Sequence, residues 1–505
     1  MRSWRTFTLA ALLAAASSAC TVGPDFTPPA APVAARYTAP DEAALGKGAV
    51  GTPVPWQAMA LGERVTATWW TLFRSPEIDA VVKEAIAGSP TLESASARLA
   101  EARDTFAAAS GELYPQVDLS ASATRGKINA ANFGLNPDRT PLPPNYNAYQ
   151  LGPTVSFALD IFGGTRRQIE AKAALVDVQR YQLDAAYQTL TGNAVTQAIQ
   201  LAAARAQVQA IHDILDLDRK NLELVRTERQ AGSVPDTDVV SAQSQLATDE
   251  TLLPGPEQQF DAAGHALAVL LGRAPGEWSP PDLDLAAMKL PGTLPVSLPS
   301  ELVHQRPDIL AAEAKLHVAC AQIGVATAKL YPSITLSGSV GTAALDPGHL
   351  FSPAGLLWSV AAGLTEPVFD GGTREAERRA ALAEFKASAA DYRRTVLQAF
   401  DQVADTMQAL AHDAELLADQ RQALDVASES VRLQRISYSG GGSGILPLLD
   451  AQRQYQQARL GYVRADAQRY QDTIQLLVAM GGGWWDANVA AAQDDTNPVR
   501  SAGHG

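Results

Sequence analysis

The residue types that could carry catalysis occur in this chain without the spacing that catalysis needs. The chain has seven histidines, and no two of them are four residues apart, the spacing at which two imidazoles bind one metal from a helix. The glycine-rich run at 440–444 lacks the following lysine of a phosphate-binding loop. No Gly-x-Ser-x-Gly elbow stands between a strand and a helix. The sequence therefore predicts a protein that is not an enzyme and needs no metal or other cofactor.

Cys20 is the residue with the clearest predicted chemistry. Residues 1–19 hold two arginines, a short apolar stretch and small residues directly before Cys20, an arrangement typical of a signal peptide. The apolar stretch is too short to span a bilayer. The pattern predicts cleavage before Cys20 and covalent attachment of lipid, such as palmitate, to this residue. A plain signal peptide followed by a cysteine by chance is the alternative, because Ser17 stands where a lipobox usually has Leu. With Cys20 acylated, Cys320 has no partner for an intrachain disulfide.

The net charge of −14 argues against nucleic acid as a partner, because phosphate binding needs a basic patch. A solvated acidic surface is the simplest explanation of the charge. No segment after the signal peptide reads as a transmembrane helix. A chain without such a helix can still span a membrane if its strands close into a barrel.

Four segments alternate apolar and polar residues with a period of two, the pattern of strands with one apolar face. They are residues 116–124, 150–161, 333–340 and 358–368, and Glu366 in the last of them shares the apolar face. Strands of about ten residues can cross a bilayer when tilted. A soluble sandwich gives the same alternation, but four strands cannot cover themselves and the other apolar residues belong to predicted helices. Four strands are too few to close alone, so the sequence favours a transmembrane barrel shared between chains.

Two very long helices are predicted at residues 165–230 and 373–439, because neither contains proline and only the first contains a glycine, Gly192. Each would be about 100 Å long. The second carries apolar residues seven apart, which indicates coiled-coil packing: Leu382, Ala389, Val396, Val403, Leu410, Leu417, Leu424 and Val431. A solvated coiled-coil rod is the alternative, but a rod does not need four strands of membrane-spanning length.

The sequence repeats itself over nearly its whole length. A Leu-Tyr-Pro tripeptide at 113–115 recurs at 330–332, and Gly-Gly-Thr-Arg at 163–166 recurs at 371–374. Matching landmarks in one order indicate an internal duplication. The predicted organisation is a signal peptide (1–19), a lipidated extended segment (20–75), a first repeat (76–272), a linker (273–299), a second repeat (300–484) and a flexible C-terminal tail (485–505).

Four short motifs, taken in order, carry a resemblance to a known family. They are Cys-Thr-Val-Gly-Pro-Asp-Phe at 20–26, Ser-Pro-Glu-Ile at 75–78, Leu-Asp-Ala-Gln-Arg at 449–453 and Gly-Gly-Gly-Trp at 481–484. They resemble the outer-membrane factor family (TolC/OprM/NodT), in its lipoprotein branch. The resemblance implies a mixed α and β membrane protein, with a shared barrel of four strands per chain that continues into a long helical coiled-coil barrel in the periplasm.

The same resemblance implies a function, a location and partners. The chain is expected to be the outer-membrane channel of a tripartite efflux pump, lipid-anchored in the bacterial outer membrane, and a passive exit duct for drugs or other small molecules. The implied assembly is a homotrimer bound to a periplasmic adaptor (membrane fusion) protein and, through it, an inner-membrane efflux transporter. The spacing and composition of the sequence do not specify three subunits, because a closed ring of another number of chains fits them equally well.

The resemblance also assigns roles to the two predicted hairpin tips. Asp450, Asp238 and Tyr438 match positions that narrow or link the periplasmic entrance, although Ser443 replaces a basic partner found in the TolC branch. A solvated helix carboxylate is the alternative for Asp450. The predicted adaptor-contact residues are Gly232, Ser233, Val234, Gly441, Gly442 and Ser443.

Two other functions stay open from the sequence. A TolC-like exit duct for secreted proteins differs from an efflux channel only in its partner pump. A periplasmic coiled-coil adaptor or scaffold would have one hairpin with soluble β-domains, whereas this chain has two predicted tips and strands patterned for a membrane.

Overall fold

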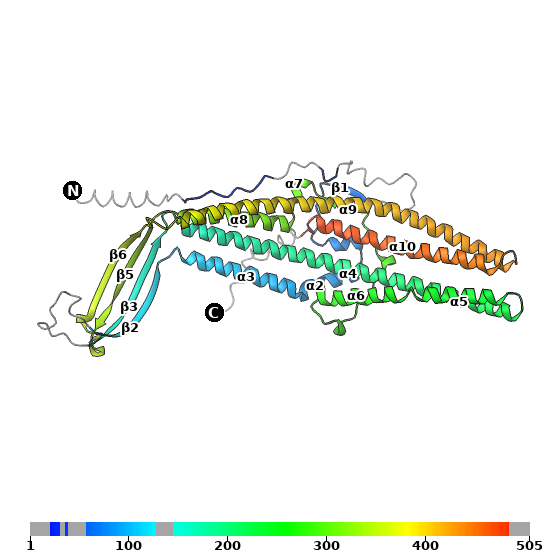
Figure 1. Cartoon of the computed structure of the whole chain (residues 1–505), viewed down its shortest axis with the longest axis horizontal. Coiled ribbons are helices and arrows are strands. Elements are labelled where there is room, and N and C mark those ends of the chain that lie inside the picture. The colour runs from blue at the N-terminus through cyan, green and yellow to red at the C-terminus, as the bar shows by residue number, and fades with distance from the viewer. Residues whose placement is uncertain (1–20, 31–35, 39–56, 128–144, 484–505) are drawn as a thin grey trace, which may run out of the picture. The chain divides into compact units, whose positions relative to one another are not determined.

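A computed structural model of the chain describes residues 21–30, 36–38, 57–127 and 145–483 (Figure 1). The predicted signal peptide, Cys20 and the predicted C-terminal tail lie outside the described residues. Contacts within the chain define two compact units. The sheet unit comprises residues up to Pro29, Leu99–Gln179 and Ala312–Tyr392, and the hairpin unit comprises Ala30–Arg98, Arg180–Ala311 and the residues from Arg393 onward. Both units draw on both predicted repeats, and the predicted domain limits remain a prediction.

The sheet unit contains an antiparallel sheet with the strand order β2-β3-β5-β6 (Figure 1). The strands are β2 (Gln116–Gly126), β3 (Tyr146–Leu159), β5 (Ser333–Ala344) and β6 (Leu356–Thr365). The predicted strands are all present. Short 3₁₀ turns at Pro347–His349 and Pro353–Gly355 lie between β5 and β6.

The strand register gathers the alternating apolar residues of all four strands on one face of the sheet. Leu336 pairs with Phe157 on one side and Ala362 on the other, and Ile334 pairs in the same way with Leu159 and Leu364. The opposite face carries mostly small and polar residues, among them Ser339 and Ser359, whose hydroxyl oxygens are 2.8 Å apart. A one-residue slip would mix the two sets, so the register itself is selected by the alternation.

β2 and β5 extend past their predicted ends, β3 begins four residues before its predicted start and stops two residues before its predicted end, and the last strand differs from its predicted bounds of 358–368. β6 begins two residues earlier and ends at Thr365, so Glu366 lies beyond the strand and not on its apolar face. The physical reason is Pro367, which has no backbone N–H to donate, so pairing stops before it.

Helix α8 (Pro307–Ala328) departs from the expectation that no later segment has the character of a membrane span. By length and composition this helix could cross a membrane, with a mean hydropathy of 1.3 over its most apolar window. However, 56% of that window is buried inside the protein, as in the core helix of a soluble domain. α8 follows the shorter α7 (Pro299–Leu302), and α3 (Pro90–Gly111) is the corresponding helix before β2.

The hairpin unit is dominated by helices that run out to two tips and return. The outgoing helices are α4 (Gly164–Gln230) and α9 (Thr373–Ser439), which agree with the predicted long helices. The first return is divided into α5 (Asp236–Glu250) and α6 (Pro254–Leu270), because Pro254 and Pro256 cannot continue a helix interior. The second return is one helix, α10 (Ile445–Ala479). Val396, Val403, Leu410 and Leu417, the central positions of the seven-residue repeat in α9, are buried.

A small mixed region completes the hairpin unit. The short strands β1 (Ala58–Leu61) and β4 (Thr293–Val296) pair in parallel. The same unit contains α2 (Pro76–Gly88) and 3₁₀ turns at Trp69–Phe73, Pro275–Glu277 and Leu285–Ala287. Trp69 and Phe73 are fully buried, and the Phe73 ring lies 6.0 Å from that of Tyr470 on α10. This contact holds the turn at Trp69–Phe73 against α10.

Candidate functional site

The first hairpin tip is a tight turn between α4 and α5 formed by residues 231–235. Gly232 has a φ of 77°, a conformation that favours glycine because it has no Cβ. The N–H of Ser233 donates to the Glu228 carbonyl at 2.9 Å, which caps the end of α4. The guanidinium of Arg229 forms a two-pronged ion pair with Asp236, at 2.5 and 3.0 Å, and thereby lowers the pKa of that carboxyl. The Arg229–Asp236 pair was not predicted from the sequence.

The second tip is the glycine-rich turn between α9 and α10. Gly441 has a φ of 70°, and the N–H of Gly442 donates to the Ser437 carbonyl at 2.8 Å. Gly441 and Gly442 are exposed, as are Gly232 and Ser233 at the first tip. The six predicted adaptor-contact residues therefore all lie at the ends of the two hairpins.

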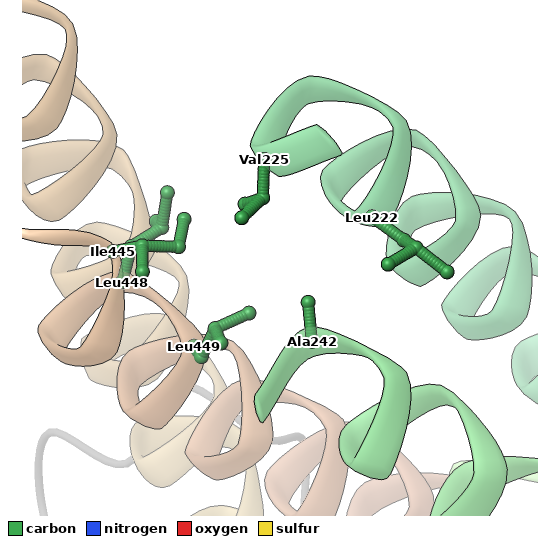
Figure 2. Close-up of a cluster of buried hydrophobic side chains, with 6 residues drawn as sticks. All are labelled: Leu222, Val225, Ala242, Ile445, Leu448 and Leu449. Atoms are coloured by element: carbon green, nitrogen blue, oxygen red, sulfur yellow. The ribbon is translucent and has the colours of Figure 1, made fainter. Parts of the chain in front are cut away.

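An apolar cluster joins the two hairpins just behind their tips (Figure 2). Its buried members come from α4, α5 and α10: Leu222, Val225, Ala242, Ile445, Leu448 and Leu449. Val234, one of the predicted contact residues, is only partly exposed because it packs on this cluster. The cluster fixes the two tips beside each other within one chain.

Tyr438, a predicted gate residue, links the two hairpins through a residue that the sequence analysis missed. Its hydroxyl donates to the Glu228 carboxylate, so the end of α9 is bonded to the end of α4. Burial raises the pKa of Tyr438, and the nearby Glu228 and Asp238 carboxylates raise it further. Glu228 lies one helical turn before Gly232, and that position relative to the tip was the available signal.

The other two predicted gate residues have different surroundings. Asp238 lies half-buried in the first turn of α5, where Thr237 donates its hydroxyl to the Asp238 carboxylate at 3.5 Å. The Asp450 side chain is 49% exposed on α10, where it pairs with Arg453 and accepts a bond from Gln454 at 2.9 Å. Thus Tyr438 and Asp238 lie near each other at the tips, whereas Asp450 is bonded along its own helix.

Buried carboxyl groups farther along the hairpins were also missed from the sequence. Asp218 of α4 is 2% exposed and Asp249 of α5 is 5% exposed. Burial, together with contact with the Asp249 carboxyl, raises the pKa of Asp218 to about 8. Gln456 of α10 donates to Asp218 at 3.4 Å. Two carboxyl groups buried in contact are stable when they share a proton, so this layer joins three helices and carries one negative charge instead of two at neutral pH.

A second carboxyl pair, Asp413 and Asp472, joins α9 to α10. Burial and contact with Asp472 raise the pKa of Asp413 as well. Across the described parts of the chain, no three His, Cys, Asp or Glu side chains gather where they could hold a metal ion. The arrangement is that of packed hairpins with exposed tips.

Comparison with known proteins gives consistent matches over most of the chain. Residues 81–273 and 298–482 match the family model described as "Outer membrane efflux protein". The chain is 29% identical over 451 residues to the pyoverdine export outer membrane protein OpmQ of Pseudomonas aeruginosa, covering 88% of this chain and 94% of OpmQ. It is 26% identical to a Salmonella typhimurium protein named "Probable outer membrane lipoprotein SilC", covering 92% of this chain and 95% of SilC.

A solved structure has the same fold. The structure of the outer-membrane channel OprN superimposes with a TM-score of 0.81 at 30% sequence identity, and the alignment covers 92% of this chain and all of that one. The sheet with long helical hairpins is therefore the fold of known outer-membrane channels.

Proposed function

This chain belongs to the outer membrane efflux protein family, and we propose that copies of it close one transmembrane barrel and line a passive exit duct. The chain is an outer-membrane channel subunit of a tripartite efflux pump and extends into the periplasm. The finer proposals concern how the barrel closes, which residues narrow it and what it docks to.

The apolar face of the four-stranded sheet carries the proposal of a shared barrel. Val360, Leu119 and Trp358 on this face are exposed at 81%, 76% and 73% of their surface. Such a patch is too apolar to face water alone. In a bilayer the same face contacts lipid, while the polar face lines the lumen. β2 and β6 are each paired on one side only, so both can pair with neighbouring chains. Three copies give about twelve strands, enough to enclose a lumen.

The internal duplication supports a ring of similar hairpins. Each predicted repeat supplies two strands, one long outgoing helix and one return, so three chains present six comparable hairpins around one axis. The exposed tip residues Gly232, Ser233, Gly441 and Gly442 are the proposed contact with a periplasmic adaptor, which connects to an inner-membrane transporter. No catalytic step is proposed, since the duct acts by enclosing a path.

Two further proposals complete the function. Cys20 is the proposed site of the lipid anchor, supported by its signal-like context and by the lipoprotein name of SilC. Asp450, Asp238 and Tyr438 are the proposed gate at the periplasmic entrance. Carboxylates repeated around a narrow axis repel one another and attract cations, which suits a constriction that closes with bound cations.

Cross-linking between the two edge strands tests the shared barrel. Ala121→Cys on β2 and Ala362→Cys on β6 lie on the same apolar face, at opposite edges of the sheet. In membranes, a short bismaleimide should convert the doubly substituted chain into covalent multimers whose ladder ends at the trimer. A matched chain with Val155→Cys on the same face of the central strand β3 in place of Ala121→Cys should stay monomeric. Absence of multimers from the edge pair contradicts the shared barrel.

Co-purification tests the pump assignment. Solubilised native membranes should yield the chain together with an adaptor and an inner-membrane transporter, and deletion of the gene should increase sensitivity to exported small molecules. Recovery with a protein-secretion transporter instead would favour the secretion duct.

A further inference from the structure

The beginning of the described chain, residues 21–26, lies against the sheet unit through contacts with residues far away in sequence. The N–H of Val22 donates to the Phe162 carbonyl at 3.1 Å, just after β3. The Cys320 thiol of α8 lies 3.7 Å from the Pro24 carbonyl. We refer to residues 21–26 as the N-terminal segment. Its two bonding partners are separated by more than 150 residues, so the segment is held by tertiary structure.

Arg167, in the first turn of α4, makes most of the polar contacts to this segment. Its guanidinium donates to the carbonyl of Val22 at 3.2 Å, to that of Gly23 at 3.3 Å and to the Asp25 carboxylate at 2.7 Å. The Arg167 side chain is only 5% exposed. A buried guanidinium is costly unless its donors are paired. Most of the pairing of Arg167 therefore depends on the segment being in place.

Glu170 and His317 extend the same network to α8. Glu170 accepts a bond from Arg167 at 2.7 Å and one from His317 at 2.9 Å. Burial alone would raise the pKa of Glu170, but these two hydrogen bonds lower it, so the carboxylate stays charged opposite Arg167. The Phe26 ring stacks on the His317 ring, with centroids 4.3 Å apart and planes 10° from parallel. The far end of the segment is thus held by an aromatic contact.

Two glycines on the helical side give the segment room to approach the backbone. A Cβ at Gly163 would lie 2.4 Å from the Thr21 side chain, and one at Gly324 would lie 2.6 Å from Arg167. A Cβ on Gly23 of the segment itself would come within 2.5 Å of the Gly324 backbone. A side chain at Gly23 would meet backbone, and one at Gly163 or Gly324 would force Thr21 or Arg167 to move. Backbone fit, ion pairs and stacking all select the same placement of the segment.

We propose that Arg167, Glu170 and His317 form a clamp that holds residues 21–26 of their own chain against the starts of α4 and the body of α8. Arg167 is then a positioning residue for the lipid anchor, because the proposed acylation site immediately precedes the clamped segment in the sequence. This second part rests on the proposed lipidation of Cys20, whereas the clamp itself does not.

Alkylation of Cys320 measures whether the clamp is closed. Cys320 is 3% exposed and lies under Pro24. In the full-length protein extracted from outer membranes, Arg167→Gln should increase the rate of maleimide reaction with Cys320 by about tenfold or more, because opening of the segment uncovers the thiol. Arg166→Gln is the matched control: Arg166 is the neighbouring residue but bonds Asp160 and not the segment. Equal rates for the two variants would overturn the clamp.

Hydrogen exchange on the segment itself gives a second measurement. The amide of Val22, which donates to the Phe162 carbonyl at 3.1 Å, should be protected in the wild type and lose that protection in Arg167→Gln, while the amides of β3 and β5 keep theirs. Phe26→Ala alters a side chain of the N-terminal segment and leaves the sequence of α4 unchanged. It should cause the same local loss of protection, so the test still works if Arg167→Gln misfolds. An unprotected wild-type segment, or unchanged exchange in both variants, contradicts the proposal.

The number of reactive thiols separates the clamp from the lipid proposal. The chain has two cysteines. If Cys20 carries a thioether-linked lipid, denatured protein reacts with one maleimide per chain, whereas an unmodified Cys20 gives two. If two thiols react per chain and Cys320 reacts faster in Arg167→Gln than in the wild type, the lipid anchor is rejected and the clamp is supported. If one thiol reacts per chain and Arg167→Gln does not change the rate at Cys320, the lipid anchor is supported and the clamp is rejected.

Discussion

The sheet and the hairpins place their apolar side chains in opposite ways. On the sheet, Val117, Leu119 and Val360 are more than 60% exposed, and the strands enclose no core of their own. At the hairpins, Leu222, Val225 and Leu448 are almost fully buried by neighbouring helices. The hairpins therefore bury their apolar side chains within one chain, whereas the exposed apolar face of the sheet fits the proposed contact with lipid and with neighbouring chains. The two regions should respond differently to substitutions that are chemically similar.

The largest difference is expected from a charge on the apolar face of the sheet. Leu336→Arg should abolish most membrane assembly, because a charge facing lipid costs about 2–4 kcal/mol per copy near the midplane. Ser337→Arg, on the opposite face, should assemble, since water in the lumen solvates its charge. The measurement is the fraction of each variant in outer membranes that migrates as an intact oligomer. Equal assembly of the two would mean that the apolar face does not contact lipid.

A core truncation at the tips should have a large local effect with no loss of membrane insertion. Leu448→Ala removes a side chain that is 3% exposed in the apolar cluster and should cost about 2–5 kcal/mol of local stability. Hydrogen exchange at both tips should increase. Leu446→Ala, on the same helix but 56% exposed, is the control and should change little. Similar exchange in both variants would mean that the cluster does not hold the tips together.

The buried carboxyl pair makes the hairpins, but not the sheet, sensitive to pH. Because the pKa of Asp218 is raised to about 8 in the folded chain, the folded state binds more protons than the unfolded state between about pH 4 and 8. The contribution of this pair to hairpin stability is therefore greatest below about pH 4 and falls as pH rises through this window. Each unit by which the pKa is raised corresponds to about 1.4 kcal/mol, so the loss across this window should be on the order of 5 kcal/mol.

Asp218→Asn should flatten this pH dependence, because the amide cannot ionise. Urea unfolding of the hairpins, followed by hydrogen exchange at pH 5 and pH 8, provides the measurement. Asp216→Asn is the control, since Asp216 is exposed and paired with Arg219 on the same helix. A wild-type protein with the same hairpin stability at both pH values would rule out the shared proton.

Asp450→Ala tests the proposed constriction with a smaller effect. Assembly should be unchanged, because the side chain is half exposed and bonded only to Arg453 and Gln454. Cation preference and cation block in planar bilayers should weaken by up to about fivefold, since one charge contact in water contributes about 1 kcal/mol. Unchanged selectivity would show that the carboxylate faces solvent away from the duct.

The smallest expected effect is loss of the bond between the two hairpins at Tyr438. Tyr438→Phe removes one hydrogen bond to Glu228, worth about 0.5–1.5 kcal/mol, and should slightly raise the resting conductance. Glu228→Gln and the double variant complete a cycle: the two changes should not add, because they remove the same bond. Additive effects would separate Tyr438 from Glu228 in the closed entrance.

Much of the fold could be predicted because its elements have strong local signals. The α9 helix begins at Thr373 and ends at Ser439 as predicted, since proline is absent and the Gly-Gly turn and glycine-rich tip mark its ends. The strands follow from period-two alternation. β6 was misplaced at its ends because alternation alone does not account for the missing N–H of Pro367.

The site was less predictable because its contacts are long-range. Glu228 and Tyr438 are 210 residues apart. The sequence places each of them near a tip but does not indicate that they bond to each other. The partners of Arg167 could not be read from the chain either, because one of them, Asp25, is 142 residues away. The contact between Asp218 and Asp249 depends on how α4 and α5 are rotated relative to each other. The hydrophobic periodicity of the sequence does not specify that rotation.

The sequence by itself determined the kind and the order of the elements: alternating strands, two very long helices, glycine-marked tips and a signal-like beginning. These features are local, so backbone geometry and hydrophobic periodicity are enough to specify them. Only the tertiary structure decided which side chains meet. It brought the N-terminal segment to Arg167, the Tyr438 hydroxyl to Glu228 and two buried carboxyls together, because such contacts depend on the register and rotation of packed elements.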